Sequence, residues 1–303
     1  MPRSVTYTFK YVEKCNMCGS DSRKHKVMGK RLNQAQGKNA MHKVGITTTV
    51  MQCTDCNLIY TNPMPVPASI SDHYGVPPEE YWNADFFTTD EKEFAPEIKT
   101  LSTLMKINPD SRSLDIGAGI GKNMIALEKA GFDSFGLEPS EPFYKRAIEK
   151  MGVKPEKIKL SSVEEAKYIE NYFDFISFGA VLEHLYDPSE AIERTLSWLK
   201  PGGIIHIEVP SSKWAINRLV NFYYKINGTD YVANLSPMHV PYHLYEFDLE
   251  SFYKNSEKNK YEIVAHEYFV CSTFMPKIFD SVFKRYMRKT NTGMQLTVWL
   301  RKK

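Results

Sequence analysis

From about residue 93 to residue 210, the chain alternates between two spacings of apolar residues. Apolar positions recur at the spacing of one helix face in segments 93–107, 121–132, 141–152, 163–172 and 187–200. Short apolar runs typical of buried strands lie between them, at 111–117, 133–138, 157–162, 173–178 and 204–210. This alternation predicts an α/β fold, with a doubly wound, mostly parallel sheet that has helices on both faces.

The last of these helices has the clearest start, and the C-terminal part of the chain then changes pattern. Asp187, Pro188 and Glu190 have the order of an N-cap, a first-turn proline and a capping box. Residues 261–270 and 294–302 read as strands, and we expect them to pair antiparallel at the sheet edge, which gives seven strands in all.

The segment between these two strands, residues 276–289, predicts an amphipathic helix. Its apolar face is expected to pack against the core. Lysines and arginines on its other positions leave a second hypothesis open, in which this helix contacts an anionic membrane. The apolar residues are Ile278, Phe279, Val282, Phe283 and Tyr286.

The composition is that of an ordinary globular protein. Of the 303 residues, 42% are hydrophobic and 25% are charged, which excludes wholesale disorder. Lys and Arg number 39 against 36 Asp and Glu, and a net charge of +3 argues against a surface dedicated to nucleic acid. The sequence has no apolar run of membrane-spanning length, and its first residues lack the apolar core of a signal peptide, so we expect a cytoplasmic protein.

Four of the five cysteines form two C-x-x-C pairs near the N-terminus, whereas Cys271 stands alone as an expected core residue. In a reducing compartment, two such pairs predict a closed, structural zinc site, and four buried or redox-active thiols are the alternative. Gly19 and Asn57 follow the pairs, and these residue types most easily adopt the positive φ that a tight turn around an ion needs. The predicted ligands are Cys15, Cys18, Cys53 and Cys56.

The segment between the two cysteine pairs is basic, with no acidic residue from residue 22 to residue 43. We expect a solvated loop; the alternative is a positive surface beside the active site that attracts a phosphate-bearing substrate. Pro63, Pro65 and Pro67 then predict a stiff, extended segment where the chain leaves the cysteine-containing module. We therefore place a small N-terminal zinc-ribbon module at residues 1–75 and the α/β domain at residues 76–303.

A glycine-rich turn, LDIGAGIG at residues 114–121, follows the first strand of the α/β pattern. Glycines here allow a sharp turn and the close approach of a ligand. The spacing differs from the G-x-G-x-x-G of dinucleotide sites. Glu138 ends the next strand, 23 residues after Asp115, where a carboxylate can accept both hydroxyls of a ribose. The alternative for Glu138 is a solvent-facing strand end.

The segments LDIGAGIG, GLEPS, FDFISFGAVLEHLYDP and LKPGGIIHIEVP, in this order, resemble the motifs of class I S-adenosylmethionine-dependent methyltransferases. The N-terminal CNMCG and CTDCNLIYTNPMP are similar to a zinc-binding module of sugar methyltransferases from antibiotic and surface-polysaccharide pathways. The resemblance implies a Rossmann-like methyltransferase fold over residues 92–303, with S-adenosylmethionine as cofactor and zinc as a structural ion.

The same resemblance implies which residues bind the cofactor. Those expected around the glycine turn and the amino-acid portion are Asp115, Gly117, Gly119 and Gly121. Glu138 would hold the ribose, and Tyr81 would help to cover the cofactor. Ser162 and Val163 would flank the adenine, and Phe178 and Gly179 would face the methionine side of the cofactor.

Histidines after the fifth strand are candidates for a general base. A sulfonium is already an activated methyl donor, but a hydroxyl or carbon acid must also lose a proton. His239 and His243 have the residue type that suits proton removal at neutral pH. Residues 243–247, HLYEF, resemble the H-L-x-Y-F stretch whose histidine is the base in sugar C-methyltransferases, although Tyr242 replaces the usual glutamate and Glu246 the usual tyrosine. Loop histidines that bond to the backbone are the alternative.

We therefore expect an S-adenosylmethionine-dependent methyltransferase that acts on a small polar acceptor, a nucleotide-linked or surface-polysaccharide sugar. Glu183 and His184 would lie at the lip of the pocket and either orient the substrate or cap the next loop. The competing hypothesis is a zinc-module RNA-binding protein or an RNA methyltransferase, against which the near-neutral charge argues. A nicotinamide-dependent sugar enzyme fits the glycine spacing poorly.

Overall fold

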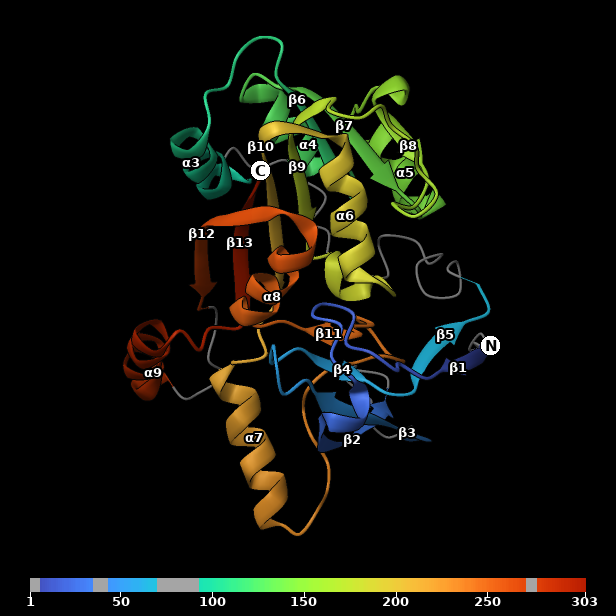
Figure 1. Cartoon of the computed structure of the whole chain (residues 1–303), viewed down its shortest axis with the longest axis vertical. Coiled ribbons are helices and arrows are strands. Elements are labelled where there is room, and N and C mark those ends of the chain that lie inside the picture. Colours follow the sequence, from blue (N-terminus) through green and yellow to red (C-terminus); the bar gives the residue numbers. More distant parts are fainter. Residues whose placement is uncertain (1–5, 35–42, 70–92, 271–276) are drawn as a thin grey trace.

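The computed structural model describes residues 6–34, 43–69, 93–270 and 277–303 (Figure 1). A large α/β part contains one sheet covered by helices, and two smaller sheets are formed mainly by N-terminal residues. The predicted division at residue 75 lies outside the described residues, as do Tyr81 and Cys271.

The α/β part is built on a seven-stranded sheet with the order β12-β13-β10-β9-β6-β7-β8. Its strands are β6 (Arg112–Ile116), β7 (Asp133–Glu138), β8 (Ile158–Leu160), β9 (Phe173–Gly179), β10 (Leu199–Pro210), β12 (Tyr261–Phe269) and β13 (Gln295–Lys302). Neighbours from β8 to β10 pair parallel, whereas β13 runs antiparallel between β10 and β12. The predicted mostly parallel sheet with an antiparallel pair at its edge is therefore confirmed.

Helices cover both faces of this sheet because successive strand side chains point to opposite sides. The helices are α3 (Ala95–Leu104), α4 (Lys122–Lys129), α5 (Glu141–Glu149), α6 (Pro188–Trp198), α7 (Ala215–Ile226), α8 (Leu249–Asn259) and α9 (Lys277–Thr290). Ile205 and Ile207 of β10 belong to the core shared with α6 and α8, whereas Ile204 packs with Leu101 of α3 and Leu127 of α4. The sheet is therefore doubly wound, as predicted.

Two local predictions differ in outcome. The predicted start of α6 is confirmed, because the Asp187 carboxylate accepts a hydrogen bond from the Glu190 N–H at 3.0 Å. The predicted helix at 163–172 is wrong, because that segment forms two turns joined by irregular chain. Its Tyr168 packs edge-on against Phe173 of β9 and Trp198 of α6, with ring centroids 5.0 and 5.2 Å away. This packing holds the segment against the domain without a helix.

Part of the basic segment between the cysteine pairs is a strand and not the expected loop. Its residues 26–34 form β2 (Lys26–Gln34), which makes an antiparallel hairpin with β3 (Lys43–Gln52). The hairpin belongs to a four-stranded sheet of order β11-β4-β3-β2, in which β4 (Ile59–Thr61) pairs with β11 (Tyr245–Glu246) from the α/β part. A separate pair joins β1 (Tyr7–Lys10) to β5 (Met64–Pro67).

Helices α7 and α9 lie at the edge of the molecule farthest from α5 and β8 (Figure 1). The prediction that the apolar face of α9 packs against the core is wrong for most of its members. Ile278, Phe279, Val282 and Tyr286 are exposed, and the helix docks instead through buried Met287 and partly buried Phe283. Among the described residues, no helix combines the length and apolar character needed to cross a membrane.

Candidate active site

The turn between β6 and α4 is shaped by glycine. Gly117 and Gly119 have φ values of 68° and 56°, in the left-handed region that favours this residue. A Cβ on Gly117 would lie 2.5 Å from Cγ2 of Val181, so no larger residue fits there without displacing Val181. A Cβ on Gly119 would meet nothing closer than Phe143 at 3.9 Å. The turn therefore leaves open space over Gly119.

Glu138 lies at the carboxyl end of β7 and faces this turn. One carboxylate oxygen accepts the Gly119 N–H and the other accepts the Ser140 N–H, each at 2.7 Å. Burial raises the pKa of the Glu138 carboxyl to about 7, while the two N–H bonds favour its ionised form. Because Glu138 borders the cavity described next, it is not a solvent-facing strand end.

A cavity of about 1180 Å³ opens beyond the carboxyl ends of β6, β7 and β9. In open α/β sheets, this edge is where ligands bind. Small-molecule sites usually measure about 300–1,000 Å³, so this one has room for a cofactor together with a small acceptor. The residues predicted from the resemblance that line it are Gly117, Gly119, Glu138, Ser162, Val163 and Gly179.

Three residues expected at the cofactor do not line the cavity. Asp115 is buried behind the glycine turn, where it accepts a hydrogen bond from the Ser177 hydroxyl at 2.6 Å, and burial raises the pKa of its carboxyl to about 6. Gly121 has a φ of 83° and abuts Val153, where a Cβ would lie 2.5 Å from Cγ2. Phe178 is fully buried in the core. These three support the turn and the sheet from behind.

A second group of polar side chains lines the same cavity. It consists of His184, from the 3-10 turn Leu182–His184, and His243. Both contact the carboxylate of Glu183, which belongs to the same turn but is buried and does not line the cavity. One Glu183 oxygen lies 3.7 Å from Nε2 of His243 and 3.9 Å from Nε2 of His184, and the two imidazole centroids are 5.1 Å apart. The Leu244 N–H donates to the Glu183 carbonyl at 2.9 Å, which fixes the His243 segment against the turn.

Burial shifts both members of the Glu183–His243 pair toward their neutral forms. It raises the pKa of the Glu183 carboxyl to about 8 and lowers the pKa of the His243 imidazole to about 3, with a further reduction from His184. The second Glu183 oxygen is buried without a hydrogen-bond partner among the described residues. A neutral imidazole can accept a proton, so this cluster has the chemistry of an acid–base centre.

His239, the second candidate for the general base, does not line the cavity. Its Nε2 is 3.2 Å from the guanidinium of Arg31 in β2, and Arg31 also donates to the Leu235 carbonyl. Burial, followed by the positive charge of Arg31, lowers the pKa of the His239 imidazole to about 4. His239 therefore fastens the N-terminal sheet to the 232–247 segment.

Sequence reasoning did not find the residues that the N-terminal part adds to the cavity wall. Lys10, Asn16 and Pro67 line it, and the Asn16 amide donates to the Tyr186 carbonyl at 3.3 Å. The two partners are 170 positions apart, and although each lies within a motif segment, neither motif indicates a contact between them. By contrast, the described basic residues of the 22–43 segment do not line the cavity.

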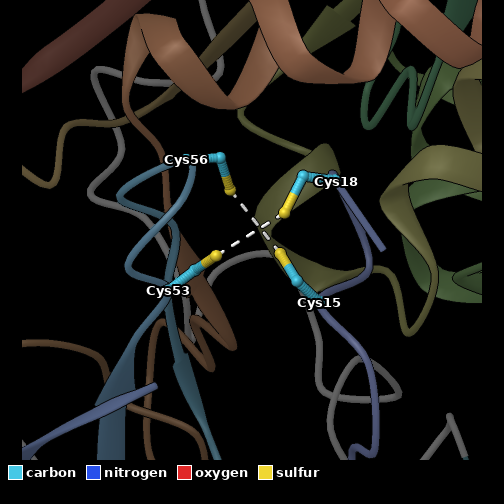
Figure 2. Close-up of side chains that lie close together, drawn as sticks. All are labelled: Cys15, Cys18, Cys53 and Cys56. Carbon is cyan, nitrogen blue, oxygen red and sulfur yellow. Dashed lines mark hydrogen bonds between the residues drawn. The ribbon is translucent and has the colours of Figure 1, made fainter. Parts of the chain in front are cut away.

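The four N-terminal cysteines converge from two separate turns, and their side chains point toward one centre (Figure 2). The Sγ atoms of Cys15 and Cys56 are 3.6 Å apart, and those of Cys18 and Cys53 are 3.5 Å apart. Four thiolates around zinc, with Zn–S bonds of about 2.3 Å, would place sulfurs about 3.8 Å apart. Gly19 and Asn57 have φ values of 78° and 59°, which confirms the predicted positive φ after each pair. The donor set therefore fits one tetrahedral ion.

Helix α8 of the α/β part holds both cysteine turns. The Ser251 hydroxyl donates to the Cys56 carbonyl at 2.8 Å, and the Asn255 amide donates to the Met17 carbonyl at 3.0 Å. Ser251 also completes the capping box with Asp248 at the start of α8. The first cysteine turn thus lies between α8 and the cavity wall formed by Asn16.

Comparison with known proteins adds the following. Residues 86–266 match the family described as "Methyltransferase domain". An uncharacterized methyltransferase of Schizosaccharomyces pombe is 30% identical over 121 residues, which is 36% of this chain and 44% of that protein. A ubiquinone biosynthesis O-methyltransferase of Methylococcus capsulatus is 27% identical over 154 residues, 50% of this chain and 60% of that protein. The chain thus spans about half the length of the curated relatives it matches.

Two further similarities are more distant. A tRNA U34 carboxymethyltransferase of Syntrophotalea carbinolica is 28% identical over 143 residues, 45% of this chain and 40% of that protein. The crystal structure of a SAM dependent methyltransferase from Archaeoglobus fulgidus aligns with a TM-score of 0.49 at 19% identity, covering 72% of this chain and 97% of that one.

Proposed function

Since this chain belongs to the methyltransferase-domain family, we propose that it is an S-adenosylmethionine-dependent methyltransferase and that it methylates a sugar, either nucleotide-linked or part of a surface polysaccharide. The observation that carries the proposal is one continuous cavity that borders the glycine turn with Glu138 and also His184 and His243, the two histidines that contact the buried Glu183 carboxylate. The first region suits the cofactor, and the second suits the group that is to be methylated.

In this proposal, different residues of the cavity bind different parts of the cofactor. The open space over Gly119, beside Gly117, takes the amino-acid portion, and Ser162 with Val163 flanks the adenine. Each Glu138 oxygen accepts one N–H and keeps a further lone pair, so the carboxylate can also accept the ribose hydroxyls. Gly179 lies on the methionine side. When bound, the cofactor supplies an electrophilic methyl group.

His243 is the proposed general base. Its low pKa keeps the imidazole neutral at physiological pH, so Nε2 can take a proton from an acceptor hydroxyl or carbon. The imidazolium that forms lies beside Glu183, and its positive charge lowers the pKa of that carboxyl and favours the ionised form. His184 contacts the same carboxyl and holds the acceptor in place.

The charge of the cavity wall supports a small acceptor over RNA. Its acidic residues include Glu164, Glu165 and Asp187, and Arg194 is paired with Glu190 at 3.1 Å. Carboxylates accept hydrogen bonds from sugar hydroxyls, and they repel the many phosphates of an RNA backbone more than the single diphosphate of a nucleotide-linked sugar. The likeness to a tRNA-modifying enzyme keeps RNA as the second candidate.

We also propose that Cys15, Cys18, Cys53 and Cys56 bind one structural zinc ion, since all four ligand positions are filled by protein. The alternative of redox-active thiols predicts a disulfide on oxidation instead. Free thiols in this number fit a reducing compartment, the cytoplasm. The division into residues 1–75 and 76–303 stays a prediction.

The function is tested in two steps, binding and transfer. Isothermal titration of the protein with S-adenosylmethionine should show micromolar-scale binding, and Gly119→Arg should abolish it, because the arginine would enter the cavity from a backbone with φ 56°. Equal heats from both proteins would remove the cofactor assignment. Labelled cofactor is then offered with nucleotide sugars, polysaccharide fragments and bulk tRNA, and label in tRNA alone would favour the second candidate.

A further inference from the structure

Helix α7 carries an exposed row of large apolar side chains. Leu219, Phe222, Tyr223 and Ile226 follow the i, i+3, i+4, i+7 spacing of one helix face, and Ile226 is 68% exposed. The opposite face docks through buried Asn217. The helix therefore packs through small or polar residues, Ala215 and Asn217, and leaves its large apolar side chains in solvent, unlike an ordinary surface helix.

Helix α9 repeats the arrangement. Ile278, Val282 and Tyr286 are spaced by four residues on one face, and Ile278 and Val282 are 79% and 69% exposed. The helix rests on Met287, which packs with Ala215 at the start of α7. The two helices therefore meet where α7 begins and α9 ends, and both lie at the same edge of the molecule (Figure 1).

The charges on these two helices are strongly one-sided. Helix α9 contains five basic residues and one acidic residue, a net charge of +4, and α7 contains two basic residues and no acidic residue, a net charge of +2. Because the whole chain has a net charge of only +3, the rest of the chain is net negative. The only acid, Asp280, is paired with Lys284 at 2.8 Å. Arg218, Arg285 and Lys289 stay beside the apolar rows, and long basic side chains can reach over an apolar face to a polar interface.

We propose that α7 and α9 form a membrane-docking surface that seats the enzyme on an anionic lipid bilayer. An apolar row flanked by lysine and arginine is the arrangement with which an amphipathic helix enters the headgroup region of an anionic membrane. A second copy of the chain suits this surface less well, because face-to-face contact would bring two strongly basic α9 helices together.

The proposal is tested with the full chain and lipid vesicles. Cosedimentation compares vesicles of phosphatidylcholine alone with vesicles that also contain phosphatidylglycerol. We expect binding to the anionic vesicles only, weakened by high salt. The double variants Phe222→Ser/Ile226→Ser and Ile278→Ser/Val282→Ser should each reduce it about tenfold or more. Ile169→Ser is the matched control, because Ile169 is 74% exposed but lies outside both helices.

Each outcome is decisive because the substituted side chains are exposed and the fold does not depend on them. Failure to bind anionic vesicles overturns the proposal, and so does binding that the row variants keep or that Ile169→Ser removes. A dimer in gel filtration that the same variants dissociate would assign the surface to a second copy instead. Methyl transfer to a soluble acceptor should be unchanged in the row variants, so this test is independent of the proposed function.

Discussion

At the scale of single residues, the proposed chemistry depends most on His243. Replacing His243 with Gln keeps a polar side chain of similar size but removes the proton acceptor. Because general base catalysis contributes roughly 10²–10⁴-fold, we expect kcat to fall by about that factor. The affinity for S-adenosylmethionine should stay near the wild-type value, since His243 lies in the acceptor region. Single-turnover assays with titration calorimetry measure both quantities.

His239→Gln serves as the matched control for this variant. His239 comes from the same segment of chain but contacts Arg31 outside the cavity. Its variant should therefore keep wild-type kcat even if its stability changes. Equal losses of activity in the two variants would show that the segment acts structurally and that neither histidine is the base.

Glu183 makes the proposed centre sensitive to pH. Burial raises the pKa of its carboxyl to about 8, so the carboxyl is mostly protonated at pH 7 and ionises as the pH rises through that value. If the ionised form stabilises the imidazolium of His243, kcat should rise through about pH 8 in the wild type. Glu183→Gln should remove this rise, and a superimposable pH profile would exclude Glu183 from the step.

His206 predicts how stability depends on pH. It is fully buried between Phe94 and Trp299, and its ring nitrogens have no hydrogen-bond partner among the described residues. Carboxylate oxygens of Glu97 and Glu208 lie within 4.8 Å of one of these nitrogens. Burial lowers the pKa of its imidazole to about 3.

Because the unfolded chain takes up this proton near the ordinary histidine pKa of about 6.5, the stabilising contribution of neutral His206 is complete above that pH. It is lost as the pH falls from about 6.5 toward 3. Chemical denaturation at several pH values should show that His206→Leu flattens this acid-side decrease in the free energy of unfolding. An unchanged slope would show that His206 does not titrate in this way.

At the scale of elements, the sequence predicted well the segments whose own residues carry a clear pattern. It predicted poorly the segments whose conformation depends on contacts with distant parts of the chain. The parallel strands and α6 carry their own signals, an apolar run or a capped start. The segment 163–172 has a helical spacing, but its Tyr168 packs on Phe173 of β9 and Trp198 of α6, which come together only in the folded domain. Similarly, β2 owes its strand form to pairing with β3.

The positive φ values of the two cysteine turns were predicted from the sequence. The zinc proposed between these turns can be tested by removing it with a chelator. Each turn is short and buried against α8, so without an ion only a few hydrogen bonds would hold it. We expect about one zinc per chain by elemental analysis. Chelation should lower the melting temperature and also kcat, because Asn16 of the first turn lines the cavity. A zinc-free protein with an unchanged melting temperature would contradict the assignment.

At the scale of the whole molecule, the site is assembled from residues that no linear pattern connects. The glycine turn and Glu138 were predictable because adjacent parallel strands end at one edge of the sheet. The separation of His243 from His239 was not, because it depends on which side chain faces Arg31 across a contact of 208 positions. Nor could the sequence show that the N-terminal sheet ends in a strand supplied by residues 245 and 246.

Because β11 of the α/β part completes the N-terminal sheet, we expect the two predicted modules, residues 1–75 and 76–303, to unfold together. Glu246 of β11 is buried, and its carboxylate accepts hydrogen bonds from the Asn234 amide at 2.5 Å, the Leu235 N–H at 3.0 Å and the Asn217 amide at 3.3 Å. Glu246→Ala would leave these buried donors without an acceptor, at a cost of about 1–3 kcal/mol for an unsatisfied group. Glu262→Ala is the matched control, since Glu262 is exposed and its carboxylate pairs with Arg301 at 3.4 Å on the surface.

Scanning calorimetry should show one cooperative transition for the wild type, because β11 links β4 of the N-terminal sheet to the segment that carries His243. Glu246→Ala should lower that single transition, whereas Glu262→Ala should leave it nearly unchanged, as expected for an exposed ion pair. Two resolved transitions in the wild type would mean that the cysteine module folds independently. The cavity wall at Asn16 could then be lost while the cofactor region stays folded.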